Sequence, residues 1–147
     1  MAELNFTPEQ RAAIDTRGST VLVSAAAGSG KTRVLTERLM AYLTDAENPV
    51  DIDRFLVITY TRAAAAELRS RILDGIYARI ASDPENRRLR RQAALCARAE
   101  IGTIHSFCAD FLRANCAALA LAPDFQVADT ERCIALRTTA LEHTLER

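Results

Sequence analysis

Residues 21–39 read VLVSAAAGSGKTRVLTERL, and this stretch limits the possible folds of the 147-residue chain more than any other. The apolar run predicts a strand over about Thr20–Ser24, and the helical spacing that follows predicts a helix from Lys31 to about Thr44. Gly28 and Gly30, two of the five glycines, lie between them. A strand that leads through a glycine turn into a helix directs several backbone N–H groups at one point, which favours an anion there.

Lys31 is the only lysine among the nineteen basic residues, and it stands between Gly30 and Thr32. A lysine at this place reaches the β- and γ-phosphates of a nucleotide as a compact charge, and the threonine hydroxyl can ligate Mg²⁺. Ala25 stands where the strict pattern G-x-x-x-x-G-K-[ST] has its first glycine. A flexible turn before a helix is the alternative, but the flanking strand and helix favour a phosphate site over residues 25–32.

The order of the other predicted elements indicates an α/β fold. A short helix is expected from Pro8, further strands over 54–60 and 100–104, and helices over 62–81, 86–98, 105–120 and from about Asp129. Alternating strands and helices predict a parallel sheet flanked by helices. Three strands are few for such a sheet, so we expect the chain to be the N-terminal part of a larger protein.

Apolar residues at helical spacing predict the buried faces of these helices. The predicted rows are Val34, Leu35, Leu39, Tyr42 and Leu43; Leu68, Ile72, Ile76 and Ile80; Phe107, Cys108, Phe111 and Leu112; and Ile134, Leu141 and Leu145. We expect the last row to pack on another surface, since an exposed apolar stripe favours association.

Composition narrows the class of protein. Hydrophobic residues make up 49% of the chain, which excludes a disordered chain. The formal net charge is zero, but residues 54–113 carry eleven arginines against six acidic residues, a net of +5 that weakly indicates a polyanionic partner. The sequence has no membrane-spanning run and no signal peptide pattern, so a cytoplasmic location is expected.

The four cysteines, at positions 96, 108, 116 and 133, have no Cys-x-x-Cys spacing, and His105 and His143 are not placed to complete a zinc site. We therefore expect reduced thiols on buried helix faces.

Three further segments each have two interpretations. Thr7-x-x-Gln10, with a proline at the first helical position, is by spacing a capping box. TYTR (59–62) ends a predicted strand, where ligands gather in α/β sheets. It either offers two hydroxyls and an aromatic face to a ligand, or consists of a buried tyrosine between two capping threonines. The run RRLRR (87–91) is the densest charge, and a solvated helical face is favoured over contact with a DNA backbone.

Four segments occur in order: FTPEQRAAID, SAAAGSGKTRVLTERL, ITYTRAAAAELRSRI and IGTIHSFCADFLR. They resemble the Q motif, Walker A, motif Ia and motif Ib of UvrD/Rep/PcrA-type superfamily 1 DNA helicases. TIHSFC and PDFQVADTERCIAL are most similar to the AddA-type helicase–nuclease subunits of that family. The resemblance covers nearly the whole chain. It implies that residues 1–147 form part of a first RecA-like P-loop NTPase domain, with an inserted helical subdomain beginning at about residue 114.

The resemblance also implies an enzyme that couples ATP hydrolysis to 3′–5′ movement on single-stranded DNA in double-strand break repair and recombination. ATP and Mg²⁺ are then cofactors, and an AddB-like protein is a partner. The Walker B carboxylates, the arginine finger and any nuclease motif are not found in this sequence. The alternatives are a stand-alone UvrD/PcrA-type helicase, a P-loop phosphotransferase, for which no acceptor pocket is evident, and a non-catalytic nucleotide-binding module.

By resemblance, Gln10 reads the adenine edge, Arg33 lies near the base, and Lys31 and Thr32 carry the catalytic and Mg²⁺-ligating roles. The implied nucleotide-binding residues are Gln10, Ala25, Ala26, Ala27, Gly28, Ser29, Gly30, Lys31, Thr32 and Arg33. The implied DNA-binding residues are Thr59, Tyr60, Thr61, Arg62, Thr103 and His105. Tyr60 stands where phenylalanine is usual, and Arg62 where asparagine is common. From the residues alone, His105 is more typical of a helix start than of a functional site.

Overall fold

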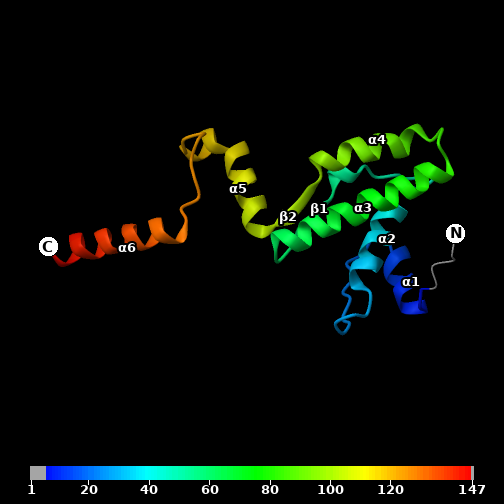
Figure 1. Ribbon diagram of the computed structural model, residues 1–147, viewed down its shortest axis with the longest axis horizontal. Helices are drawn as coiled ribbons and strands as arrows, with labels where there is room; N and C mark the ends of the chain where they lie inside the picture. Colours follow the sequence, from blue (N-terminus) through cyan, green and yellow to red (C-terminus); the bar gives the residue numbers. More distant parts are fainter. Residues whose placement is uncertain (1–5, 147) are drawn as a thin grey trace. The chain divides into compact units, whose positions relative to one another are not determined.

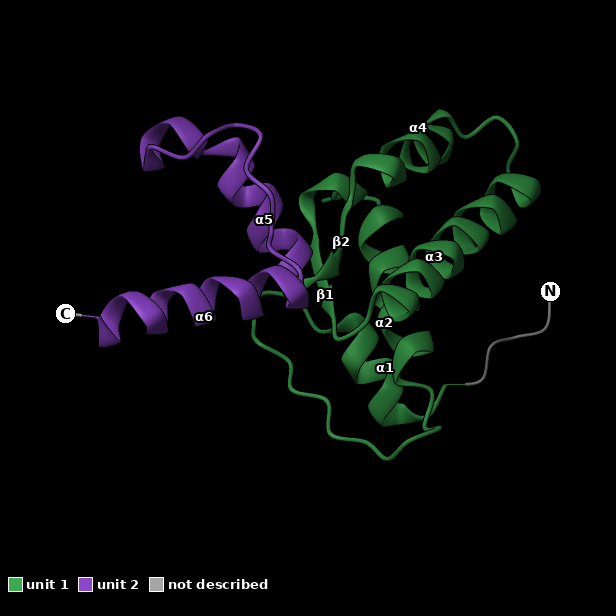
Figure 2. Cartoon of the chain, turned by 60° about the vertical axis from the view of Figure 1, so that its left-hand side comes forward, with its two compact units in different colours: residues 1–104 green, residues 105–147 purple. Residues whose placement is uncertain are grey.

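A computed structural model describes residues 6–146 and divides the chain into two compact units. The first unit ends at Ile104 and the second begins at His105 (Figure 2).

The first unit contains four helices and two strands among its described residues (Figure 1). They are α1 (Pro8–Asp15), α2 (Lys31–Leu43), β1 (Leu56–Thr59), α3 (Arg62–Ser82), α4 (Arg87–Leu95) and β2 (Glu100–Thr103), with short 3₁₀ turns at Ile52–Arg54 and Cys96–Arg98. The strands pair in parallel, from Leu56 opposite Glu100 to Thr59 opposite Thr103. Helix α3 packs against both strands and also against α2 and α4. The predicted α/β class, with a parallel sheet and flanking helices, is confirmed.

The strand predicted over Thr20–Ser24 is wrong. These residues lie in an irregular segment between α1 and α2, and the side chain of Leu22 is 93% exposed. A strand forms only by pairing its backbone with a neighbour, and in the described residues β1 and β2 pair with each other alone. The apolar residues are typical of a strand, but this segment pairs with neither of the two described strands.

The core of the first unit lies where α2, α3 and α4 meet the strands. Its fully buried side chains are Met40, Leu43, Ile52, Ile72, Ile76 and Cys96. Burying an aliphatic side chain of this size stabilises the fold by about 1.5–3 kcal/mol. The predicted row on α3 is confirmed, with Ile80 partly buried; on α2, Leu35 is exposed and Met40 is buried instead.

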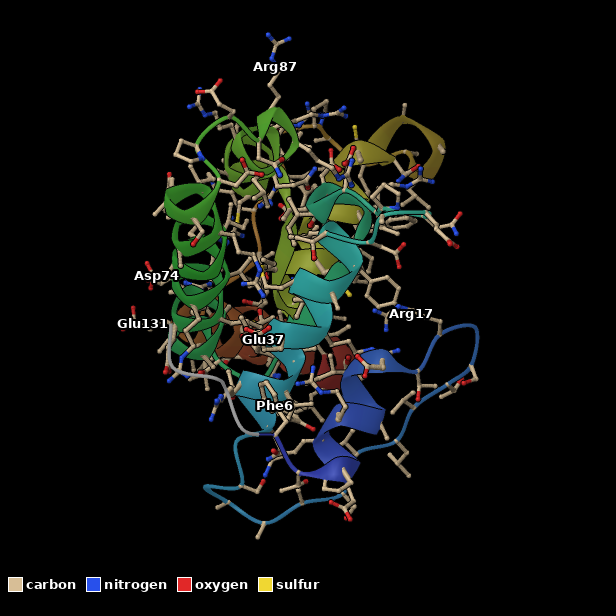
Figure 3. The ribbon with its side chains drawn as sticks, turned by 90° about the vertical axis from the view of Figure 1, so that its right-hand side faces the viewer. Phe6, Arg17, Glu37, Asp74, Arg87 and Glu131 are labelled. Atoms are coloured by element: carbon tan, nitrogen blue, oxygen red, sulfur yellow. The ribbon has the colours of Figure 1, made fainter. Side chains whose placement is uncertain are left out.

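The arginine run of α4 is not simply a solvated face. Arg88 and Arg91 pair with Asp51 at 3.2 Å and 2.8 Å, and the Arg88 Nε also donates to the Leu43 carbonyl at the end of α2. Leu89 is buried, while Arg87 projects outward (Figure 3). Arg88 thus joins α4 to the segment before β1, whereas Arg87, Arg90 and Arg91 are exposed and agree with the favoured interpretation of a solvated helical face.

The second unit contains α5 (Ile104–Ala114) from its second residue onward, a 3₁₀ turn at Cys116–Leu119 and α6 (Thr130–Leu145). Helix α5 ends earlier than predicted, because its last predicted turn takes the 3₁₀ form. Neither helix buries a residue within the described chain, so the predicted packing of the α6 row is not found there. The exposed residues of that row are Ile134, Leu141 and Leu145.

The four cysteines are free thiols, as expected, but only Cys96 is buried. The prediction of buried positions is wrong for Cys108, which is exposed, and overstated for Cys116 and Cys133, which are partly exposed. Across residues 6–146, no helix combines the length and apolarity needed to cross a bilayer.

Candidate functional site

The glycine loop (residues 25–30) leads directly into α2. Gly28 has φ = +78° and Gly30 has φ = +83°, a backbone region that residues with a Cβ rarely adopt. Gly30 is the N-cap of α2 and offers no side-chain cap. The two glycines thus give the loop its turn and leave the start of the helix open.

The first turn of α2 has backbone donors to spare. The first intrahelical bond is from the Val34 N–H to the Gly30 carbonyl, at 3.0 Å. Among residues 6–146, no acceptor is found for the N–H groups of Lys31, Thr32 and Arg33. The Ser29 hydroxyl is buried and likewise has no partner in the described chain. A helix N-terminus with free donors and a positive dipole end suits an anion such as a phosphate.

The Lys31 ammonium closes the loop on itself. Its Nζ donates to the carbonyl of Ala25 at 2.8 Å and to that of Ala26 at 2.6 Å. The side chain therefore turns back to the start of the loop, and its charge lies against two loop carbonyls. A phosphate bound there would exchange weak carbonyl partners for a full negative charge, which makes a stronger bond.

Gln10 joins α1 to the glycine loop. Its Oε1 accepts from the Thr7 N–H at 3.0 Å, and the Thr7 hydroxyl accepts from the Gln10 N–H at 3.3 Å, so the predicted capping box is confirmed. Its Nε2 donates to the Ser29 carbonyl at 3.1 Å. The second contact spans nineteen positions, and the sequence pattern gave no sign of it.

A pocket of about 230 Å³ lies between α1 and the glycine loop. Its lining comprises Thr7, Glu9, Gln10, Ala13, Val23, Ser24, Ala25, Ser29, Lys31 and Val34. Hydrogen bonds from its own backbone N–H and from the Thr7 side chain lower the pKa of Glu9. The pocket therefore combines apolar walls with an amide, an ammonium and a carboxylate, a mixture typical of small-molecule sites.

Phe6 also lies beside this site and was missed by the sequence patterns. The Arg33 guanidinium carbon is 4.7 Å from the centroid of its ring, and that of Arg11 is 5.3 Å away. In Figure 3, Phe6 lies between α1 and the N-terminal end of α2. An aromatic residue before a predicted cap was the only available signal.

The carboxyl ends of β1 and β2 form a second edge. The hydroxyl of Thr59 donates to the Thr61 carbonyl at 3.0 Å, and the hydroxyl of Thr61 caps α3 by accepting from the Ala64 N–H. Tyr60 is fully exposed, so the interpretation as a buried tyrosine is wrong, whereas that of Thr61 as a cap is confirmed. Thr103 is buried and lies in register with Thr59.

The remaining predicted DNA contacts are exposed. Arg62 begins α3 in the first unit, and His105 lies on α5 in the second. In the part of the chain that the structure describes, no group of three or more His, Cys, Asp or Glu residues is arranged to hold a metal ion.

Comparison with known proteins decides the family. Residues 6–147 match the family described as UvrD/REP helicase N-terminal domain. The chain belongs to this family. It is 49% identical over 146 residues to a Clostridium acetobutylicum protein named as an ATP-dependent helicase/nuclease subunit, and the match covers 99% of this chain and 12% of the relative. Proteins of the same name from Thermoanaerobacter sp. and Pelotomaculum thermopropionicum are each 50% identical, over 96% and 97% of the chain.

These matches confirm the resemblance to UvrD-type helicases and, within them, to helicase–nuclease subunits. The chain spans about an eighth of the length of the relatives that it matches. In each relative the likeness therefore concerns one part of a longer protein.

Proposed function

We propose that the chain binds the triphosphate of ATP at the glycine loop and forms the nucleotide-binding part of an AddA-type helicase–nuclease. The observation that carries this proposal is the open N-terminus of α2, with Lys31 turned into a loop shaped by two left-handed glycines. The relatives, named ATP-dependent, support the choice of nucleotide.

In this proposal each loop residue has a defined task. The backbone N–H groups of residues 25–32 surround the phosphates, and the Lys31 ammonium leaves the loop carbonyls to bind their β- and γ-oxygens. The Thr32 hydroxyl, which is exposed, ligates Mg²⁺. A metal ion held there would neutralise part of the phosphate charge.

The nucleobase is assigned to Gln10 and Arg33. The Gln10 amide lines the pocket beside the loop, and Arg33 directly follows Lys31 and Thr32. An amide offers both a donor and an acceptor, as the edge of adenine requires.

Single-stranded DNA is assigned to the carboxyl ends of β1 and β2. The fully exposed ring of Tyr60 offers a face on which a base stacks. Thr59, Thr61, Arg62 and Thr103 lie on the same edge as candidate backbone contacts, and His105 follows on α5. The net charge of +5 over residues 54–113 favours a polyanion.

For the whole protein we propose 3′–5′ movement on single-stranded DNA, a role in double-strand break repair in the cytoplasm, and an AddB-like partner. These follow from the likeness to helicase/nuclease subunits and not from the described residues. A stand-alone helicase without a nuclease is the second candidate. A phosphotransferase has no support, because the family match covers residues 6–147.

The experiment is calorimetric titration of the purified protein with Mg-ATP. Lys31→Ala is expected to weaken binding by more than about tenfold, the cost of one charge-assisted contact to phosphate. Arg87→Ala, an exposed change on α4, is the matched control and is expected to bind like the parent protein. A Lys31→Ala protein that melts normally and keeps the parental affinity would falsify the proposal.

A further inference from the structure

Phe6 lies beside the proposed nucleotide site, and two arginines from different helices approach its ring. Arg11 belongs to α1 and Arg33 to α2, and both guanidinium groups lie within cation–π distance of its half-buried ring. We propose, on the basis of the nucleotide site proposed above, that Phe6 is a positioning residue that holds Arg33 ready for the nucleobase.

Arg33 depends on Phe6 for its position. Among residues 6–146, no hydrogen bond or ion pair from another group fixes its guanidinium, and its side chain is exposed. A free arginine loses much rotamer freedom when a ligand immobilises it. A contact that is formed before the ligand arrives reduces this loss and so strengthens binding.

The segment that carries Phe6 is itself fixed to the glycine loop. Four residues after Phe6, Gln10 donates to the Ser29 carbonyl, and the capping box joins Gln10 to Thr7. One short stretch thus supplies both the Phe6 ring, which contacts Arg33, and the Gln10 amide, which contacts Ser29 of the loop. The guanidinium carbon of Arg33, 4.7 Å from the ring centroid, therefore lies beside the same short stretch that carries the Gln10 amide.

Arg11 is not the partner that matters for binding. Its guanidinium carbon is 5.3 Å from the ring centroid, farther than the 4.7 Å of Arg33, and Arg11 is on α1, whereas Arg33 directly follows Lys31 and Thr32 in α2. Two cations beside one ring also repel each other. Removing Arg11 therefore leaves Arg33 on Phe6.

The test compares Mg-ATP with inorganic tripolyphosphate, which carries the phosphates without a base. Phe6→Leu keeps an apolar side chain but removes the aromatic face, and Phe6→Tyr keeps that face. For Phe6→Leu we expect ATP binding to weaken about two- to fivefold, the value of an exposed cation–π contact. Binding of tripolyphosphate is expected to stay unchanged, and Phe6→Tyr is expected to bind ATP like the parent protein.

Double variants separate the two arginines. With Arg33→Ala already present, Phe6→Leu is expected to cause no further loss of ATP binding; with Arg11→Ala present, it is expected to cause the full loss. Parental ATP affinity in Phe6→Leu overturns the inference, and so does an equal loss for ATP and tripolyphosphate, which would show a structural effect on the loop. If Lys31→Ala binds ATP like the parent protein, the nucleotide site itself is wrong and this inference falls with it.

Discussion

Gln10 offers the sharpest test of the site, because its amide serves a helix cap and is also proposed to read a base. The two roles are compatible. The amide has two N–H donors and an oxygen with two lone pairs, and the observed contacts to the Ser29 carbonyl and the Thr7 N–H use one of each. The remaining donor and lone pair are free to meet the amino group and a ring nitrogen of adenine.

The expected magnitudes follow from these contacts. Gln10→Ala removes two hydrogen bonds, each worth about 0.5–1.5 kcal/mol, so the free energy of unfolding is expected to fall by about 1–3 kcal/mol. It also removes two possible bonds to adenine, which lowers the ATP/GTP affinity ratio by up to about a hundredfold. Gln10→Glu keeps the acceptor for the Thr7 N–H, and its charge is favourable at a helix N-terminus. Its stability is therefore expected to change less, while the preference for ATP is lost with the donor.

The assay pairs thermal melting with ATP and GTP titrations of each variant. Thr7→Ala is the matched control, because it removes the capping hydroxyl and leaves the amide in place. It is expected to cost about 1 kcal/mol of stability and to leave the ATP/GTP ratio unchanged. The reasoning is refuted if Gln10→Ala melts earlier but keeps the parental ratio, since Gln10 would then be a cap alone.

Three further predictions concern other parts of the chain. Tyr60→Ala is expected to weaken binding of a labelled single-stranded oligonucleotide by about 1–3 kcal/mol in an anisotropy assay, with unchanged melting because the ring is fully exposed; equal binding would contradict base stacking. Gln92→Leu is expected to lower the free energy of urea unfolding by about 2–4 kcal/mol, because the buried Ile52 N–H loses its acceptor at 2.8 Å and the Asp51 carboxylate loses its donor at 2.7 Å. A change below about 0.5 kcal/mol would show that water replaces the amide. Burial raises the pKa of the Cys96 thiol above its ordinary 9.0, so the stability that the protonated thiol contributes is complete below pH 9 and falls above it. A thiol reagent is expected to label the other three cysteines in the native protein and Cys96 only after unfolding.

The helices could be predicted from the sequence because their signals are local. Thr7, Thr61, Asn86 and Asp129 each stand one residue before a helix and accept from the backbone three residues later. The 3.6-residue spacing of apolar residues also identified the buried row of α3, because that helix packs on one side against the strands. Both signals lie within a few residues of the element that they define.

The segment over residues 20–24 could not be judged in this way. Its apolar residues are typical of a strand, yet a strand also needs a partner, and pairing is decided by residues far away in the sequence. The same limit explains the arginine run of α4. Spacing shows a charged helix face, but it does not show that Arg88 and Arg91 pair with Asp51, which lies forty positions before Arg91.

The glycine loop itself was predictable, since glycine, lysine and threonine carry the chemistry within eight residues. What the pattern does not contain is the support of that loop from α1. The contact from Gln10 to Ser29 and that from Phe6 to Arg33 both connect the six-residue stretch FTPEQR with residues about twenty or more positions later. Gln10 belongs to the capping box and also contacts Ser29, so the start of α1 and the loop share one side chain. We therefore expect binding of the proposed nucleotide to be coupled to helix capping, and a ligand at the loop to protect the N–H groups of the first α1 turn from hydrogen exchange.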